Sequence, residues 1–300
     1  MKNYNRIVLF GKNGQVGWEL QRILPTLGQV IALDYEELDL ANLKLLRTKL
    51  EELKPDLIVN ASAYTAVDRA ESESGLAMKI NGQAPGVIAE TARKFGALLI
   101  HYSTDYVFDG LKYSPYVETD VPNPLNVYGE SKLAGEKAIQ QTADAYLILR
   151  TSWMYSMHLQ SGFVNKVLAW ARENEVVRIV NDQVGSPTWA RMLAEVTGHL
   201  IAQGRNYLSE YFQPYTGVYH VAGKGNVSRY EWAQAILTYA SRKGEQGVTR
   251  LEPALSSDFP TSANRPTYSA LNCTHFEKTF NLRIPDWMES LQLALKDRFF

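Results

Sequence analysis

The sequence contains a single cysteine, Cys273, among its 300 residues. One thiol cannot form an internal disulfide, and this usage fits a reducing compartment. The thiol and the five histidines show no metal-ligand spacing, so we expect no metal site. The first apolar run is far shorter than a signal-peptide core, and no later run is long enough to span a membrane. We therefore expect a cytoplasmic protein.

The sequence also lacks an excess of positive or negative charge. The chain has 31 Lys and Arg against 32 Asp and Glu, a formal net charge of −1. The basic residues are scattered, so no field would gather nucleic acid or an anionic membrane. With 45% hydrophobic and 21% charged residues, the chain is an ordinary globular protein with room for one core or two domains. A small-molecule partner is expected.

Short apolar runs alternate with stretches of helical spacing in the first half of the chain. This pattern is typical of a doubly wound α/β fold, in which helices cover both faces of a parallel sheet. It predicts a Rossmann-like dinucleotide-binding domain over residues 1–150. A smaller α/β substrate lobe is predicted over residues 151–300, partly interleaved with the first domain. The strands expected in the first domain are residues 7–10, 30–33, 57–59, 98–100 and 147–149, and those expected in the lobe are residues 177–180 and 218–221.

A glycine-rich loop follows the first predicted strand directly. Gly11, Gly14 and Gly17 stand three residues apart, and a helix is predicted to begin within the loop. Glycines here let backbone N–H groups approach a pyrophosphate, and the helix N-terminus favours its negative charge. Asp34 closes the second predicted strand, where a carboxylate would bind the adenosine ribose. Strand, loop, helix and acid in this order indicate a dinucleotide site rather than an empty turn.

Tyr128 and Lys132 are one turn apart at the start of a predicted helix, so their side chains are neighbours. A fixed ammonium beside a tyrosine favours the phenolate, which predicts a lowered pKa for Tyr128 and a role in proton transfer. Tyr239 and Lys243 have the same spacing but no setting at the edge of the sheet, so we expect no chemistry from them. Thr104, at the end of the fourth predicted strand, is expected to hydrogen-bond the reacting oxygen.

The spacing of the glycines resembles that of the extended short-chain dehydrogenase/reductase superfamily. The resemblance implies that Asp39 and Leu40 contact the adenine and that the segment after the third strand lines the cofactor. Several longer motifs are similar to the family of dTDP-4-dehydrorhamnose reductases. These motifs are residues 14–17, 66–68, 103–108, 126–129, 132–136, 150–153 and 181–183, with Gly185, Pro187, Thr188, Arg265 and Pro266.

This closer resemblance implies reduction of the 4-keto group of dTDP-4-dehydro-L-rhamnose to dTDP-L-rhamnose, the last step in making this activated sugar for bacterial surface polysaccharides. Tyr128 would donate the proton, Lys132 would hold the nicotinamide ribose, and Thr104 would assist. Asp105 and Trp153 would contact the sugar, although a tryptophan after an apolar strand is also typical of core packing. The cofactor would be held by Gly11, Gly14, Gln15, Val16, Gly17, Asp34, Asp39, Leu40, Ala63, Tyr64 and Thr65, together with Tyr128 and Lys132.

The cofactor is expected to be either NADPH or NADH. Asp34 suits a free ribose and repels a 2′-phosphate, whereas Lys12 could offer that phosphate a counter-charge. Some relatives pair through magnesium, and Glu19 could be one ligand. Arg191 and Met288 stand where further acids would be expected, so we predict a monomer or a dimer that forms without metal.

Two other functions remain open at this stage. The protein could be another nucleotide-sugar dehydratase or epimerase of the same fold, or a non-catalytic regulatory subunit that binds the cofactor. Dehydratases that resemble this chain carry an Asp-Glu pair after the threonine, whereas Asp105 is followed here by Tyr106. A phenol is a weak substitute for a carboxyl group, which favours reduction.

Overall fold

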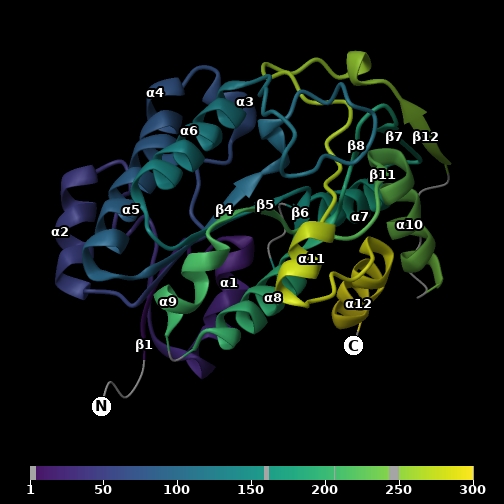
Figure 1. Cartoon of the computed structure of the whole chain (residues 1–300). Coiled ribbons are helices and arrows are strands. Elements are labelled where there is room, and N and C mark those ends of the chain that lie inside the picture. The colour runs from purple at the N-terminus through teal and green to yellow at the C-terminus, as the bar shows by residue number, and fades with distance from the viewer. Residues whose placement is uncertain (1–4, 159–161, 206, 243–249, 300) are drawn as a thin grey trace.

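A six-stranded parallel sheet forms the centre of the molecule (Figure 1). The computed structural model describes residues 5–158, 162–205, 207–242 and 250–299. The strand order is β10-β5-β4-β3-β1-β2. All five strands predicted in the first half are confirmed, and with the sixth their bounds are β1 (Asn5–Phe10), β2 (Gly28–Leu33), β3 (Leu57–Asn60), β4 (Leu98–Thr104), β5 (Tyr146–Thr151) and β10 (Gly217–His220).

The strand order reverses between β1 and β3. From β1 the chain moves outward to β2 and then returns to the other side of β1 for β3, β4 and β5. In sheets of this kind, ligands bind outside the carboxyl ends of the strands at the point of reversal. This Rossmann-like order confirms the predicted fold class and places the glycine loop, which follows β1, at the expected crevice.

Helices cover both faces of the sheet. On one face, α1 (Gln15–Ile23) packs against α8 (Ala190–Gln203), and on the other α5 (Ala84–Phe95) lies between α2 (Leu43–Leu53) and α6 (Val127–Thr142). Alternate residues of β1 serve the two faces, because successive side chains of a strand point in opposite directions. Ile7 and Leu9 join one buried cluster, and Val8 and Phe10 join the other.

The C-terminal half adds small sheets and helices beside the main sheet. β6 pairs with β9 and β7 with β12, both in parallel, and β8 pairs with β11 in antiparallel orientation. These elements are β6 (Met154–Tyr155), α7 (Phe163–Glu173), β7 (Val176–Val180), β8 (Val184–Gly185), β9 (Thr188–Trp189), α9 (Leu208–Phe212), β11 (Val227–Ser228), α10 (Arg229–Arg242), β12 (Arg250–Ala254), α11 (Thr274–Phe280) and α12 (Trp287–Phe299).

Residues 218–221, predicted as a strand of the partly interleaved lobe, lie in the main sheet. β10 lies in the main sheet and pairs with β5, from Gly217 opposite Leu147 to His220 opposite Arg150. Without β10, the outer backbone edge of β5 would lack hydrogen-bond partners. Local apolar pattern predicts a strand but does not identify its neighbour, which here lies about 70 residues away along the chain.

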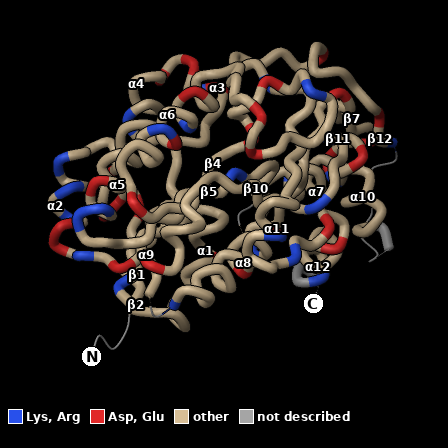
Figure 2. Tube along the Cα trace, viewed as in Figure 1, with Lys and Arg blue, Asp and Glu red and all other residues tan. Residues whose placement is uncertain are grey.

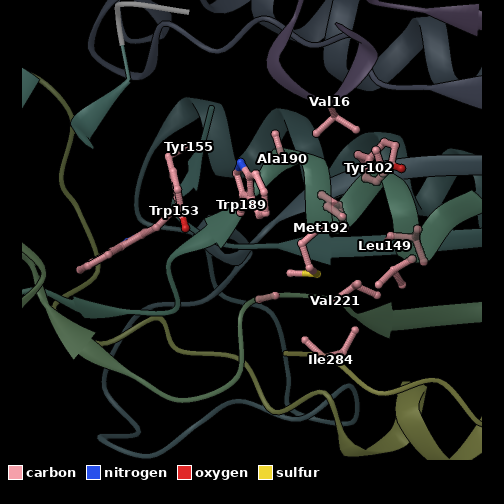
Figure 3. Close-up of a cluster of buried hydrophobic side chains, with 14 of the residues drawn as sticks. Val16, Tyr102, Leu149, Trp153, Tyr155, Trp189, Ala190, Met192, Val221 and Ile284 are labelled. Atoms are coloured by element: carbon pink, nitrogen blue, oxygen red, sulfur yellow. The ribbon is translucent and has the colours of Figure 1, made fainter. Parts of the chain in front are cut away.

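One buried cluster continues from the main sheet into the C-terminal half. Figure 3 shows Leu149 of β5 in the same cluster as Trp153, which follows β5, and as Tyr155 and Trp189 of the smaller sheets. Charged residues are distributed over the outside of both halves (Figure 2). Within the described residues, no helix is both long and apolar enough to cross a membrane. The two halves therefore pack as one unit, as the lack of a linker predicted.

Candidate active site

The glycine loop holds the start of α1 close to β3. Gly11 has a φ of +82°, and a Cβ there would lie 2.7 Å from the Ala61 carbonyl oxygen. A Cβ on Gly17 would lie only 1.9 Å from the Gly11 carbonyl oxygen. Gly14 is the N-cap of α1 and offers no side-chain hydrogen bond, so the first N–H groups of the helix stay available. This cradle fits the pyrophosphate of a dinucleotide.

A cavity of about 280 Å³ lies beside the loop, at the reversal of strand order. The structure brings seven of the predicted cofactor residues together in its lining, namely Gly11, Asp34, Asp39, Leu40, Ala63, Tyr64 and Thr65. Gln15 has a buried Oε1 without a partner among the described residues, which suits a further polar ligand group. Val16 is 3% exposed, and its side chain packs in the core and anchors the glycine loop there. These residues fit a bound dinucleotide.

The charges of Asp34 and Lys12 are both bound by other groups of the protein. The Asp34 carboxylate accepts N–H groups from Asn13 and Tyr35, each at 2.8 Å. The Lys12 ammonium forms an ion pair with Glu37, whose other oxygen accepts the Asp34 N–H at 2.9 Å. The positive charge that a 2′-phosphate would meet is therefore partly balanced in the protein.

Asn81 is a structural partner of the cofactor segment that the sequence did not reveal. It lies in a π-helical turn, η2 (Met78–Gln83), and its amide bonds the N–H and the carbonyl of Tyr64 at 2.8 and 3.0 Å. Its nitrogen also donates to Ser131 Oγ on α6 at 3.0 Å. Asn81 thus ties the predicted cofactor segment to the helix that carries Tyr128 and Lys132. A π-turn at this point is a known mark of functional sites, but it has no sequence signature of its own.

Thr104 ends β4, and Tyr128 on α6 lies next to it. The Thr104 hydroxyl is close enough to lower the pKa of the Tyr128 phenol. Thr104 Oγ1 also donates to Asp105 Oδ1 at 3.2 Å and accepts the Tyr106 N–H at 3.1 Å, which fixes its orientation. Gly129 permits this contact between α6 and the β4 loop, because a Cβ there would lie 2.3 Å from the Tyr106 carbonyl oxygen.

The predicted lowering of the Tyr128 pKa by Lys132 is wrong for this structure. Burial raises the pKa of Tyr128, and the Thr104 hydroxyl offsets only part of the rise. The Lys132 amine is bound elsewhere: it donates to the Tyr102 carbonyl oxygen at 2.7 Å and lies 3.3 Å from His101 Nε2. Lys132 is 2% exposed, and burial lowers its pKa to about 8. Desolvation therefore outweighs the expected charge effect.

Asp105 is buried and already well bonded. Its Oδ2 accepts hydrogen bonds from Ser152 Oγ at 2.9 Å and from Ser269 Oγ at 2.5 Å. Burial raises its pKa to about 6, against the opposing effects of the two serines and of Arg229. A contact between Asp105 and a sugar stays a prediction. The two serine bonds hold the loop after β4 against the end of β5 and the C-terminal segment.

Trp153 is 9% exposed and has a left-handed φ of +42°. Its ring stacks on Trp232, with the centroids 5.9 Å apart, and the Arg229 guanidinium lies 3.7 Å from its centroid. A contact with the sugar stays a prediction for Trp153 as well. Its packing agrees with the core role that the sequence also allowed.

A cavity of about 1200 Å³ opens next to these residues, between α7, β7 and the segment 256–267. Two arginines in its lining reach the catalytic end. Arg265 lowers the pKa of Tyr106, whose ring meets that of Tyr128 edge-on with the centroids 5.8 Å apart. Arg265 also pairs with Asp68 at 2.7 Å, which joins two sequence motifs 197 residues apart. Tyr128 itself is not part of the cavity lining.

Arg229 is the clearest site residue that sequence reasoning missed. The only sequence signal near it is Ser228 with Glu231 three residues later, a pattern typical of a helix capping box; the structure has both of its hydrogen bonds, at 2.9 and 3.1 Å. Arg229 follows the cap, lies among Trp153, Phe163 and Trp232, and lines the large cavity. Burial lowers its pKa to about 10, so it stays cationic at neutral pH. Within the described residues it forms no salt bridge.

Tyr239, one of the two residues from which we expected no chemistry, lies away from this site. Tyr239 lines a separate cavity of about 550 Å³ between α10 and α12, and Lys243 lies outside the described residues. No group of three or more His, Cys, Asp or Glu residues that could hold a metal occurs in the described part of the chain. Near Glu19, Arg191 pairs with Glu195 at 3.0 Å.

Known proteins with the same arrangement are similar over the whole chain. The family model described as "RmlD substrate binding domain" matches residues 5–299. A dTDP-4-dehydrorhamnose reductase of Burkholderia thailandensis is 43% identical over 298 residues, which cover 97% of this chain and 98% of that protein. That of Escherichia coli K12 is 42% identical and covers 98% of each chain. The crystal structure of dTDP-4-dehydrorhamnose reductase from Bacillus anthracis in complex with NADP has a TM-score of 0.88 at 33% identity, covering 98% of this chain and 99% of that one.

Proposed function

The chain belongs to the RmlD substrate binding domain family, and from this premise we propose that it reduces the 4-keto group of dTDP-4-dehydro-L-rhamnose to dTDP-L-rhamnose. The observation that carries the proposal is that Thr104 acts on the Tyr128 phenol at the carboxyl end of β4, in a molecule that also has the dinucleotide cradle and the large cavity. NADPH or NADH supplies the hydride when bound. The relative of known structure was crystallised with NADP.

Tyr128 is proposed to give a proton to the oxygen that becomes the new hydroxyl. Its raised pKa keeps the phenol protonated until negative charge develops on that oxygen. Thr104 orients the phenol and offers a second hydrogen bond to the same oxygen. Lys132, one turn along α6, holds the cofactor ribose and returns a proton to Tyr128 after each turnover.

Arg229 and Arg265 are proposed to bind the diphosphate of the dTDP-sugar. Both line the large cavity, and both lower the pKa of Tyr106, which lies beside Tyr128. A guanidinium binds phosphate oxygens through paired N–H groups, and each such bond is stronger than one between neutral groups. The sugar would then lie at the Tyr128 end of the cavity, with the nucleoside toward α7.

Reduction is preferred to dehydration because of Tyr106. Its side chain is half-buried, and this burial raises its pKa although Arg229 and Arg265 oppose the rise. Dehydration also needs a base that takes a C–H proton, and a phenol that stays protonated near neutral pH cannot act as that base. A regulatory subunit is disfavoured because Thr104, Tyr128 and Lys132 are all present and are assembled at the same edge of the sheet.

The test is the oxidation of NADPH or NADH by the purified protein with dTDP-4-dehydro-L-rhamnose. We expect one cofactor oxidised per sugar, and no 4-keto-6-deoxy product from dTDP-glucose with NAD⁺. Tyr128→Phe should abolish turnover and leave cofactor affinity nearly intact, whereas Lys132→Ala should reduce both. Tyr239→Phe is the control and should do little. Cofactor binding without turnover would point instead to the regulatory role.

The remaining expectations concern binding partners, oligomeric state and cellular compartment. We propose a protein that acts in the cytoplasm, without nucleic acid, as a monomer or as a dimer that forms without metal. The near balance of acidic and basic residues and their dispersal over both halves support this view (Figure 2).

A further inference from the structure

His101 is a buried titratable residue that the mechanism above does not use. It lies on β4, three residues before Thr104, and is 1% exposed. Its Nε2 lies 3.3 Å from the Lys132 amine. The same amine donates to the Tyr102 carbonyl oxygen at 2.7 Å, so the Lys132 amine lies next to two neighbouring residues of one strand.

The neighbours of His101 determine which ring nitrogen carries the proton. The Ser62 N–H donates to Asn60 Oδ1 at 3.2 Å, which orients the Asn60 amide. Asn60 Nδ2 therefore faces His101 Nδ1, at 3.0 Å. An amide nitrogen only donates, so Nδ1 is the acceptor and the proton of a neutral ring is on Nε2. Burial and the nearby Lys132 both lower the pKa of His101, so the ring is neutral.

We propose that His101 is a positioning residue for the reaction, whose fixed Nε2–H group stabilises Lys132 after the amine has passed a proton to Tyr128. The proposal rests on the proposed function. When the substrate oxygen takes the Tyr128 proton, the phenolate takes a proton from the Lys132 ammonium. The neutral amine then has a lone pair, which accepts the N–H of His101. A proton from solvent restores the ammonium.

The two contacts of Lys132 thus serve different protonation states. The Tyr102 carbonyl favours the ammonium, whereas an N–H group directed at the amine opposes the ammonium and favours the neutral form. A lysine that releases its proton near the working pH is a better proton source for a phenolate than one with an ordinary pKa. Burial already lowers the pKa of Lys132 to about 8.

The other charged groups around Lys132 do not replace this effect. Glu136, one turn further along α6, raises the pKa of Lys132. Its carboxylate is taken up by Arg150 of β5, with bonds of 2.6 and 3.0 Å, and by the Ser103 hydroxyl at 2.5 Å. Tyr128 on α6 is neutral because its own pKa is raised. His101 is therefore the group whose proton position distinguishes the two states of the amine.

The proton position can be measured without activity. Long-range ¹H–¹⁵N correlation spectra of ¹⁵N-histidine-labelled protein should show His101 with a proton on Nε2 and a bare Nδ1. Its signals should stay constant between about pH 6 and 9, where an ordinary histidine would be leaving its titration range. The five histidines are assigned by substitution. A proton on Nδ1, or a ring that titrates in this range, would overturn the proposal.

The effect on Lys132 is tested with Asn60→Asp and His101→Gln. In Asn60→Asp, a carboxylate accepts from Nδ1–H, so Nε2 becomes an acceptor that favours the ammonium. The Lys132 pKa, followed by ¹³C NMR of labelled lysine without cofactor, should rise by about 0.5 to 1 unit in either variant. The alkaline limb of the kcat–pH profile should move up by the same amount, and kcat near pH 7 should fall about 3- to 10-fold.

The matched control is His220→Gln. His220 is buried on β10 of the same sheet, and its Nδ1 contacts the Tyr116 carbonyl at 3.0 Å instead of Lys132. This variant should lose stability without moving the Lys132 pKa. An equal movement in the control, or none in Asn60→Asp and His101→Gln, would overturn the proposal. If the wild-type protein reduced no dTDP-sugar, the proposed function would fail, but the Lys132 titrations would still decide the role of His101.

Discussion

The guanidinium of Arg229 lies 3.7 Å from the centre of the Trp153 ring, at the wall of the large cavity. The two residues come from separate segments: Arg229 begins α10, and Trp153 follows β5 with a φ of +42°. Gly185 allows the indole its place, because a Cβ there would lie 2.3 Å from the ring. The aromatic ring, rather than a carboxylate, holds the Arg229 guanidinium in position.

Arg229→Gln should raise the KM for the dTDP-sugar about 10- to 100-fold, because a hydrogen bond to a charged group contributes about 1.5–3 kcal/mol. The Kd for NADPH should change little, since Arg229 lies outside the dinucleotide cavity. Steady-state kinetics and fluorescence titration measure the two constants. Arg22→Gln is the control, because Arg22 stacks on Trp18 at 3.9 Å away from the large cavity. An unchanged KM in Arg229→Gln would refute a role in substrate binding.

Asp105→Asn should change how stability depends on pH. The folded-state pKa of Asp105, about 6, lies above its ordinary value of 3.8, so the folded protein retains this proton where the unfolded chain has lost it. The contribution is present below about pH 4 and is lost as the pH rises through about 6, up to about 3 kcal/mol. Urea unfolding of both proteins at several pH values isolates it as a difference. A wild-type minus variant difference that stayed constant from pH 4 to 7 would contradict this assignment.

Glu37→Gln should shift cofactor preference toward NADPH about 3- to 10-fold in kcat/KM relative to NADH. The substitution releases Lys12 from its ion pair and removes one negative charge beside the ribose site. The amide can still accept the Asp34 N–H. Glu51→Gln is the matched control, since Glu51 pairs with Lys94 on the outside of α2 and α5. A shift toward NADH would show that Lys12 does not face the 2′-position.

Gly17→Ala should destabilise the protein by at least about 2 kcal/mol and abolish tight cofactor binding. The added Cβ would lie 1.9 Å from the Gly11 carbonyl oxygen, so α1 must move away from the loop. Gly75→Ala tests the same chemical change where nothing lies within 4 Å of the new Cβ. It should leave both properties within about 0.5 kcal/mol of wild type. If Gly17→Ala lost no more stability and cofactor affinity than Gly75→Ala, the loop would tolerate the movement of α1.

Magnesium should not change the oligomeric state. The Arg191 cation lies beside Glu19 and Glu195, and it lowers the pKa of Glu19 against the larger effect of burial. A cation at this position repels a divalent ion and occupies a carboxylate that the ion would need. Light scattering with magnesium and with a chelator should give the same molecular mass. A mass that doubled only with magnesium would contradict the prediction.

The local pattern of the chain determined the fold class and much of the site. Short apolar runs marked five strands of the sheet, and the glycines after β1 marked the cradle, because both depend on residues close together in sequence. Tyr128 and Lys132 could be chosen over Tyr239 and Lys243 for the same reason. Their place after β4 puts them at the edge of the sheet where the loops gather.

Only the tertiary structure decided the partners and the charge states of these residues. Arg265 meets Asp68 across 197 residues, β10 joins β5 from beyond the predicted boundary, and Arg229 reaches the cavity from the start of α10. No periodicity encodes such contacts, because packing brings the segments together. Burial also reversed one prediction: the Tyr128 pKa rises because desolvation depends on the whole surrounding core, whereas the spacing to Lys132 depends on one helical turn.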